Sequence, residues 1–414
     1  MASAATTVPS GVFQTPKPTL SISQKLSLLV KLFVVAPPKL IFNIIRCHAI
    51  ATVRGISYQH YLQCAFFKFA LRHLSPHQLQ FLTPPTVAGY KGWIKRRQAQ
   101  ATKRIATKPT DKTGPFLSER LKVDIEPLSD GASSICWIGD RSKATKVVYF
   151  YHGGGYAVSM SPGHFEWCLR AYLQASLELP ADSTEEVAVA VLQYTLVPHG
   201  KYPTQLTQAA DGLAHLLASG IKPENLIIGG DSAGGNLATQ LLSHLLHPHP
   251  EAKKIALEGP LAGAFLVSPW VSARTDWPSF KRNGGIDMLS KATMESGVRR
   301  LIEGVESYSL EVKDGKAWCF PADFENDIAE GWFKGLEGVV KHVYVTAGEE
   351  EVFLDQSVRI AEVVRNANPK LDVRLEVTKG EAHDWILMEG EKKADGDATK
   401  RMRSWVKDVF WSQA

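Results

Sequence analysis

The sequence has few cysteines and no strong charge of either sign, and both features restrict what the protein can be. Its five cysteines are odd in number and widely spaced, with no C-x-x-C pair. This pattern indicates neither a disulfide framework nor a zinc site, and it predicts buried free thiols in a reducing compartment. The net charge of +5 is small for 414 residues and does not indicate a nucleic-acid partner. We therefore expect no metal, no cofactor and no nucleic acid.

The N-terminal region lacks an uninterrupted apolar run. Residues 1–20 are small and rich in Thr and Pro, which predicts disorder, and they lack the basic-then-apolar order of a standard secretory signal. In the apolar segment 26–45, Lys31 and Lys39 interrupt the run and Pro37-Pro38 divides it. No uncharged stretch approaches the about 18–20 residues of a membrane-spanning helix. We expect two short amphipathic pieces, which form either a cap on the protein or a monotopic membrane anchor.

Beyond this region, short apolar runs alternate with helical patterns. The runs cover residues 121–128, 135–138, 146–151, 187–194, 225–229, 263–267, 342–346 and 372–377. Helical patterns cover residues 164–179, 204–219, 233–246, 356–367 and 398–412. The alternation predicts βαβ units and a mostly parallel sheet, and the first two runs, which have no helix between them, predict an antiparallel start. We expect a helical cap at 21–116, an α/β catalytic domain at 117–414 and an insertion above the sheet at about 270–338.

The most informative motif is Gly230-Asp231-Ser232-Ala233-Gly234. It follows an apolar run and opens a helical pattern, which is the strand–turn–helix context that G-x-S-x-G requires. A serine in this turn has a strained backbone, and the two flanking glycines leave room for it. The helix N-terminus behind the serine favours developing negative charge. We predict that Ser232 is a nucleophile.

A nucleophilic serine needs a base and an acid to orient that base. His383 is the best base, because it lies in the loop after the last predicted strand. His342 lies inside a strand, and the remaining candidates lie on or just past the helix that follows the serine: His244, His247 and His249. The acid is expected after the penultimate strand. The chemistry of the residues does not choose among the four carboxylates there: Glu349, Glu350, Glu351 and Asp355.

Three consecutive glycines, Gly153, Gly154 and Gly155, follow His152 at the end of the third predicted strand. A phosphate-binding loop would need G-x-x-x-x-G-K-[ST], or G-x-G-x-x-G opening a helix, and neither is present. Acyl transfer, by contrast, needs backbone N–H groups directed at an oxyanion. An HGGG motif and the residue after the nucleophile, here Ala233, can supply them.

These motifs together resemble the hormone-sensitive-lipase family of α/β-hydrolases, which includes arylacetamide deacetylases and fungal steryl acetyl hydrolases. The resemblance covers about residues 117–414. It rests on HGGGY at 152–156, YTLVPHGKYPTQ at 194–205, GGDSAGGN at 229–236 and the loop of His383, and LVSPWVS at 266–272 looks like fungal members. It implies an α/β-hydrolase fold with a central sheet of about eight strands and a helical cap.

The resemblance also implies roles for individual residues. Ser232 would be the nucleophile and His383 the base, and the oxyanion donors would be Gly153, Gly154 and Ala233, with Gly155 as a substitute. The family's acid lies three residues after the glycine of a G-x-x-D-x-x-x-D pattern. That position is Glu351 here, where Asp is commoner, and Asp355 is the alternative acid.

We therefore expect a serine-dependent carboxylic-ester hydrolase that acts on a hydrophobic acylated small molecule through an acyl-enzyme. A pathway enzyme of secondary metabolism that transfers an acyl group, releases a thioester or cyclises its product could use the same triad. The third hypothesis is a non-catalytic lipophile-binding protein, although binding alone does not require a nucleophile, a base, an acid and the oxyanion glycines together. The expected location is the cytoplasm. If residues 26–45 form an anchor, they would attach the protein peripherally to the endoplasmic reticulum membrane.

Overall fold

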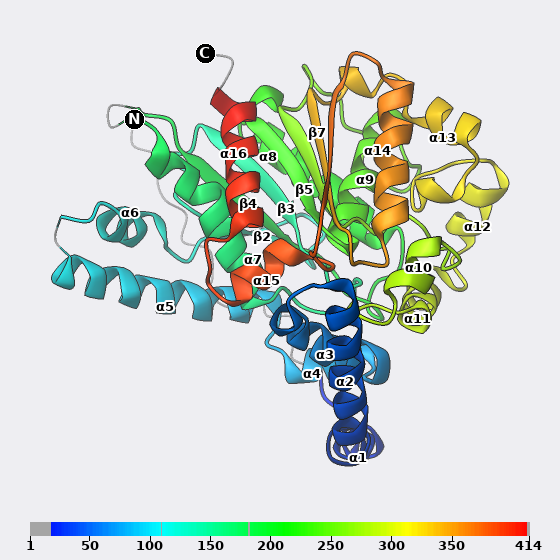
Figure 1. The fold of residues 1–414 in the computed structure, drawn as a ribbon. Helices are drawn as coiled ribbons and strands as arrows, with labels where there is room; N and C mark the ends of the chain where they lie inside the picture. Colours follow the sequence, from blue (N-terminus) through cyan, green and yellow to red (C-terminus); the bar gives the residue numbers. More distant parts are fainter. Residues whose placement is uncertain (1–17, 109, 181–182, 412–414) are drawn as a thin grey trace.

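The computed structural model describes residues 18–108, 110–180 and 183–411, and these residues form an eight-stranded sheet flanked by helices (Figure 1). The strands are β1 (Ile125–Pro127), β2 (Ser134–Ile138), β3 (Lys146–Tyr151), β4 (Val187–Gln193), β5 (Leu226–Asp231), β6 (Gly263–Val267), β7 (His342–Gly348) and β8 (Asp372–Thr378). Their order is β1-β2-β4-β3-β5-β6-β7-β8. β2 pairs antiparallel with β1 and β4, and the remaining pairs are parallel. The predicted mostly parallel sheet with an antiparallel start is confirmed.

Both faces of the sheet are covered, because its central strands are apolar on both sides. Along β3, Val147, Tyr149 and Tyr151 belong to one apolar cluster, while Val148 and Phe150 belong to a second cluster on the opposite face. The first face is covered by α8 (Thr204–Ala218), α9 (Ala233–Leu246) and α14 (Leu354–Ala367), and the second by α7 (Pro162–Trp167) and α16 (Asp397–Trp411) (Figure 1). All five cysteines lie within the described residues, and each is buried and free, as expected.

The parallel arrangement brings distant loops to one edge of the sheet. Parallel strands end at the same edge, so the segments that follow β3, β5, β6, β7 and β8 meet there. These segments carry the three glycines, Ser232, the LVSPWVS motif, the acidic loop and His383. β5 lies near the middle of the sheet, between β3 and β6, which places Ser232 centrally.

The interval between β6 and β7 forms a group of helices beside α14 (Figure 1). These are α10 (Pro278–Asn283), α11 (Lys291–Ile302), α12 (Glu306–Lys313) and α13 (Asn326–Phe333). They fall within the interval in which the sequence loses its strand–helix alternation. Apolar side chains of this group, such as Met294 and Leu301, join the same cluster as α8, α9 and α14.

The N-terminal region forms one long helix rather than the two pieces that we expected. α1 (Ile22–Val30) continues through a π-helical turn (Lys31–Val35) into α2 (Ala36–Arg54). Pro37-Pro38 does not break the helix, because both prolines lie in the first turn of α2, directly after a π-helical turn, where a missing N–H is tolerated. By length and composition, Ile22–Arg54 is able to cross a membrane. Residues 1–17 of the predicted disordered segment lie outside the described residues.

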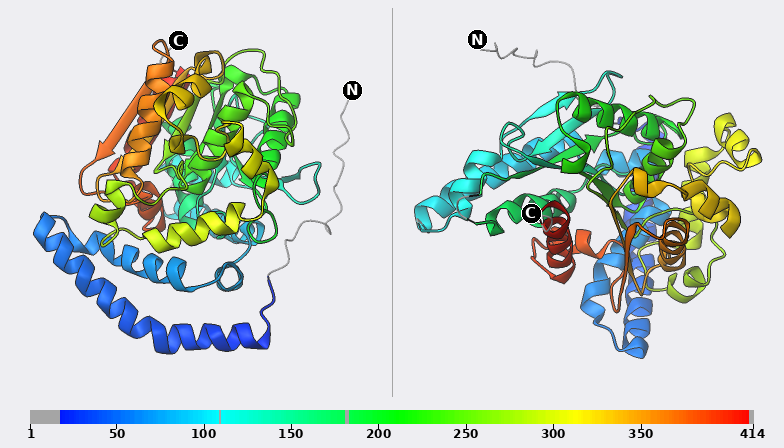
Figure 2. Two further views of the ribbon diagram at one scale, coloured as in Figure 1. Left: turned by 90° about the vertical axis from the view of Figure 1, so that its right-hand side faces the viewer. Right: turned by 90° about the horizontal axis from the view of Figure 1, so that it is seen from above.

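This long helix lies at the outer edge of the molecule (Figure 2). Cys47 and Ala51, near its C-terminal end, are fully buried in the main apolar cluster. Next to it lie α3 (Tyr58–His73) and α4 (Pro76–Leu82). The remaining α-helices of the described residues are α5 (Thr86–Thr107), α6 (Thr113–Arg120) and α15 (Trp385–Glu391). The C-terminal part of the long helix thus packs against the main body of the molecule, while its N-terminal part contacts α4 through Leu28 and lies at the lower end of the molecule (Figure 1).

Candidate active site

Ser232 lies in a sharp turn between β5 and α9, and its backbone is strained. Its φ is 51° and its ψ is −113°, a conformation that residues with a Cβ rarely adopt. A Cβ at Gly230 would lie 2.0 Å from the carbonyl oxygen of Tyr151, and a Cβ at Gly234 would lie 1.9 Å from the same oxygen. Both flanking positions of the G-x-S-x-G motif therefore require glycine, because β3 passes directly against the turn.

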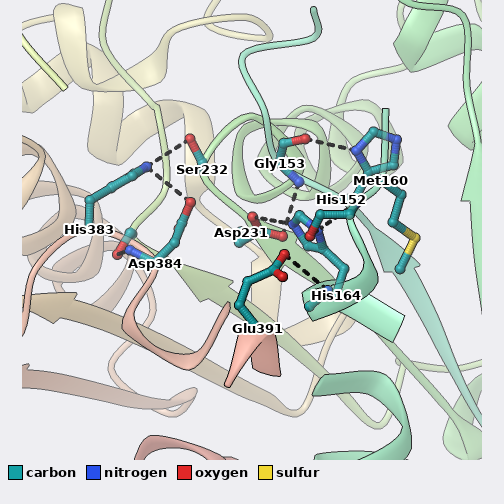
Figure 3. Close-up of polar contacts among 12 residues, drawn as sticks. His152, Gly153, Met160, His164, Asp231, Ser232, His383, Asp384 and Glu391 are labelled. Carbon is teal, nitrogen blue, oxygen red and sulfur yellow. Dashed lines mark hydrogen bonds and ion pairs between the residues drawn. The ribbon is translucent and has the colours of Figure 1, made fainter. Parts of the chain in front are cut away.

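His383 lies beside the serine, in the loop between β8 and α15 (Figure 3). Its Nε2 is 3.1 Å from Ser232 Oγ, and its side chain is almost fully buried. This is hydrogen-bond distance for a base that removes the proton of the hydroxyl. Among the histidines that we considered, His383 is the one that the structure places against Ser232.

Of the four candidate acids, Glu351 is the one placed at the histidine. Its Oε2 lies 3.7 Å from His383 Nδ1, and its side chain is fully buried. The distance is too long for a hydrogen bond and lies near the outer limit of an ion pair, and such contacts often tighten only when substrate binds. Ser268 Oγ donates a hydrogen bond of 2.6 Å to Glu351 Oε2 and so holds the carboxylate.

The alternative acid, Asp355, is engaged elsewhere. It lies in the first turn of α14, where its Oδ2 accepts a hydrogen bond of 2.6 Å from the amide of Ser279, and its Oδ1 is 3.7 Å from Arg282. Glu350, next in the acidic loop, forms an ion pair with Arg54 of α2. The geometry therefore favours Glu351 as the triad acid.

The three glycines are not equivalent, and the role that the resemblance implied for Gly153 is wrong. The Gly153 amide donates a hydrogen bond of 3.0 Å to Asp231 Oδ1, so it is not free to bind an oxyanion (Figure 3). Gly154 and Gly155 adopt the positive φ values of 103° and 60° and line the same cavity as Ser232. The candidate oxyanion donors become the amides of Gly154, Gly155 and Ala233.

Asp231 explains how the glycine loop is held, a role that we did not predict. Its side chain is fully buried and lies between two loops: Oδ1 accepts from Gly153, and Oδ2 is 3.0 Å from Nε2 of His164 at the start of α7 (Figure 3). Charge-assisted hydrogen bonds of this kind are strong in a buried site. The only signal in the sequence is the position of Asp231 within the G-x-S-x-G motif.

His152 supports the glycine loop from the other side. Its Nδ1 donates to the carbonyl of Gly153 at 2.8 Å, and the ring of Tyr194 stacks on it with centroids 4.4 Å apart. Burial lowers the pKa of His152 to about 4, so the ring is neutral at physiological pH. His152 is thus a structural support of the loop and not a second base.

Electrostatically, His383 lies between two carboxylates on opposite ring nitrogens. Asp384 Oδ2 is 3.1 Å from Nε2, while Glu351 faces Nδ1. Burial alone would lower the pKa of His383, but the carboxylates of Asp384 and then Glu351 raise it well above its ordinary value. Burial raises the pKa of Asp384 to about 7, although His383 opposes this shift. The two carboxylates therefore stabilise the imidazolium that forms when His383 accepts a proton.

A cavity of about 140 Å³ opens above Ser232 and His383. Its walls are mostly apolar. They come from the N-terminal helices (Phe67 and Leu71 of α3, Leu79 of α4), from the insertion (Met288 and Met294) and from α15 (Met388). The arrangement provides a nucleophile, a base and free amides at one end of a small apolar cavity. It can hold an acyl ester with its carbonyl against the serine.

The N-terminal helices also support the loops that carry the acid and the base. Tyr61 of α3 donates 2.9 Å to the carbonyl of Gly380, close to His383. Lys68, also of α3, donates 2.8 Å to the carbonyl of Gly284 and 2.6 Å to that of Asp287, beside the acidic loop. Arg54 holds Glu350 directly. The N-terminal helices therefore contact the loops of the site as well as lining its cavity.

Residues 147–387, more than half of the chain, match the family model described as alpha/beta hydrolase fold. The chain belongs to this α/β-hydrolase family. The match spans the sheet from β3 to β8 and contains each of the candidate site residues.

Curated relatives share parts of the chain. An esterase of Acinetobacter venetianus is 26% identical over 236 residues, which are 57% of this chain and 66% of that protein. Arylacetamide deacetylase of Oryctolagus cuniculus is 28% identical over 37% of each chain. Steryl acetyl hydrolase 1 of Saccharomyces cerevisiae is 29% identical over 31% of this chain and 27% of its own. In each case the chain spans less than two thirds of the relative's length.

Solved structures share the fold over a larger part of the chain. A thermostable esterase from Pseudomonas putida covers 86% of this chain and 97% of its own, with a TM-score of 0.57 and 19% identity. A structure described as a hormone-sensitive lipase from a metagenome library covers 77% of this chain, with a TM-score of 0.54 and 18% identity. These similarities extend the α/β-hydrolase fold to strands and helices outside the family match.

Proposed function

We propose that the protein is a serine carboxylic-ester hydrolase that acts on a hydrophobic acylated small molecule. The observation that carries this proposal is the 3.1 Å contact between Ser232 Oγ and His383 Nε2 in a small apolar cavity. The esterase and acetyl-hydrolase names of the curated relatives support the same reaction class.

The geometry supports a two-step reaction. His383 Nε2 takes the proton of Ser232 as Oγ attacks the ester carbonyl carbon, and the amides of Gly154, Gly155 and Ala233 stabilise the resulting oxyanion. The protonated imidazole then gives its proton to the alcohol oxygen as the C–O bond breaks and the acyl-enzyme forms. Water, deprotonated by the same nitrogen, attacks the acyl carbon and releases the acid and Ser232. Glu351 stabilises the imidazolium in both steps.

The test compares the purified protein with Ser232→Ala in hydrolysis of 4-nitrophenyl acetate, butyrate and octanoate. We expect the wild type to turn over at least the short esters, with loss of several orders of magnitude in the variant. A fluorophosphonate should label the wild type and not the variant. Equal activity of the two proteins would refute Ser232 as nucleophile, and an inactive, unlabelled wild type would favour a non-catalytic lipophile-binding protein. Product analysis with a competing alcohol separates hydrolysis from acyl transfer.

We also propose that the long helix (Ile22–Arg54) binds a membrane surface peripherally, with the protein on the cytoplasmic side of the endoplasmic reticulum. Ile22, Phe33 and Ile41 are 79%, 75% and 59% exposed, and apolar side chains in such a row are costly to leave in water. Residues 22–54 contain no acidic side chain, and in addition to Arg54, which pairs with Glu350, they carry four Lys and Arg side chains, a charge that complements anionic lipid headgroups.

Flotation with vesicles tests this membrane contact. We expect the full chain to bind vesicles of phosphatidylcholine and phosphatidylserine more strongly than vesicles of phosphatidylcholine alone. Phe33→Glu with Ile41→Glu should abolish binding, while Val377→Glu, a change at another exposed apolar side chain (42% exposed) on β8, should retain it. A wild type that remains unbound to both kinds of vesicle at low salt would refute the proposal.

A further inference from the structure

Asp384 is a second buried carboxylate at the reacting centre. It follows His383 directly and lines the same cavity as Ser232. Its φ of 52° and ψ of 46° place it in the left-handed region, which costs a residue with a Cβ up to about 2 kcal/mol but is tolerated by aspartate. Its amide donates to Ser268 Oγ at 3.3 Å, which holds the backbone at this position.

The carboxylate of Asp384 is only partly satisfied. Oδ2 lies 3.1 Å from His383 Nε2, whereas Oδ1 has no hydrogen-bond partner among the described residues, although the residue is only 3% exposed. Leaving such an oxygen buried without a partner is costly. An orphaned acceptor in the wall of a substrate cavity therefore points to a donor on a ligand.

The position of Asp384 shows which part of a substrate it faces. Nε2 of His383 is the atom that gives a proton to the departing alcohol oxygen, and Oδ2 of Asp384 contacts that same nitrogen (Figure 3). The orphaned Oδ1 belongs to the same carboxylate, which therefore lies beside the nitrogen that serves the alcohol side of the scissile bond. Glu391, another carboxylate of the cavity wall, accepts a hydrogen bond of 3.1 Å from the amide of Gly163 and is thus already engaged.

We propose that Asp384 is a specificity-determining residue that accepts a hydrogen bond from a donor on the alcohol portion of the ester, close to the scissile oxygen. A hydroxyl group is the simplest such donor. The substrate class is then a partly acylated polyhydroxy compound, in which a free hydroxyl lies near the acylated one. This inference rests on the proposed ester hydrolysis and specifies its substrate.

Matched pairs of esters test the inference at pH 8. The pairs are 2-hydroxyethyl, 3-hydroxypropyl and 4-hydroxybutyl acetate against ethyl, propyl and butyl acetate, and the measured quantity is the ratio of kcat/KM within each pair. We expect the wild type to prefer the hydroxylated ester by about tenfold or more for at least one chain length, because a hydrogen bond to a charged group is worth about this much. Asp384→Gly should bring that ratio to about one. Glycine suits the left-handed backbone, so this variant is expected to fold.

The control variant is Glu391→Gln, which changes the other carboxylate on the cavity wall and should keep the wild-type ratio. A wild-type ratio near one at every chain length, or an unchanged ratio in Asp384→Gly, would overturn the inference while leaving ester hydrolysis intact. A ratio that falls in Glu391→Gln but not in Asp384→Gly would also overturn it. Absence of hydrolysis of both esters, together with inactivity on the 4-nitrophenyl esters, would instead refute the proposed function on which the inference rests.

Discussion

Replacing the candidate triad acid should slow the reaction by a factor that the structure allows us to work out. Glu351→Gln keeps the shape of the side chain and an oxygen that can accept from Ser268, but it removes the charge 3.7 Å from His383 Nδ1. For two unit charges at this distance, an effective dielectric constant of about 20 gives about 4.5 kcal/mol of stabilisation of the imidazolium. At about 1.36 kcal/mol per tenfold, this corresponds to a fall in kcat of about 10³.

Asp384 makes this figure an upper estimate. Its carboxylate contacts the other ring nitrogen at 3.1 Å and continues to stabilise the imidazolium when Glu351 is neutral. We therefore expect a loss of about 10²–10³ in kcat for Glu351→Gln, with KM little changed. The assay is steady-state hydrolysis of 4-nitrophenyl acetate at fixed pH, with circular dichroism to show that the variant is folded.

The matched control is Asp355→Asn. Its oxygen can still accept from the Ser279 amide, and the partners of Asp355 are Ser279 and Arg282 rather than His383. We expect kcat within about threefold of the wild type. The reasoning would be refuted if Glu351→Gln stayed within tenfold of the wild type while Asp355→Asn lost the larger factor, since Asp355 would then be the acid.

Two further predictions concern pH. The Asp384 carboxylate raises the pKa of His383, and the base must be neutral to act. Asp384→Asn should therefore move the acidic limb of the pH profile of kcat/KM to lower pH. A limb that stays in place or moves to higher pH would contradict this prediction. Burial raises the pKa of Glu311 from 4.5 to about 7, so the folded state binds this proton more tightly than the unfolded state does. The free energy of unfolding therefore falls by about 3 kcal/mol as the pH rises from below 4.5 to above 7. Glu311→Gln keeps an acceptor for the Cys319 amide and should remove this dependence of the unfolding free energy on pH. The measurement is urea unfolding at pH 5 and pH 8. An equal dependence on pH in the variant and the wild type would contradict the prediction.

Much of the fold could be predicted, because its signals are local. The runs around β3 to β7 are apolar and β-branched over the lengths of the strands themselves, and a strand buried on both faces requires this composition. The N-terminal helix was predicted less well. Two adjacent prolines usually end a helix, but here they fall in the first turn after a π-helical segment, a detail of backbone geometry that residue types do not specify.

The candidate site, too, could be predicted from the sequence only in part. The turn at Ser232 is visible in the sequence, because a passing carbonyl excludes every residue but glycine at Gly230 and Gly234. The choice of oxyanion donors was not visible, because it depends on whether a distant carboxylate, Asp231, occupies the amide of Gly153. The contribution of Ser268 was hidden for a similar reason, since a serine after a buried strand has many ordinary uses.

By itself, the sequence of this protein determined the alternation of strands and helices, the serine turn and the loop of the base, because each is encoded by neighbouring residues. Only the tertiary structure decided which carboxylate faces His383, which glycine amides remain free and what surrounds Asp384. These depend on contacts between loops that are far apart in the chain and meet only because parallel strands end at one edge of the sheet. Hydrogen bonds and ion pairs across that edge are set by distances of a few tenths of an ångström, which no local pattern of residues records.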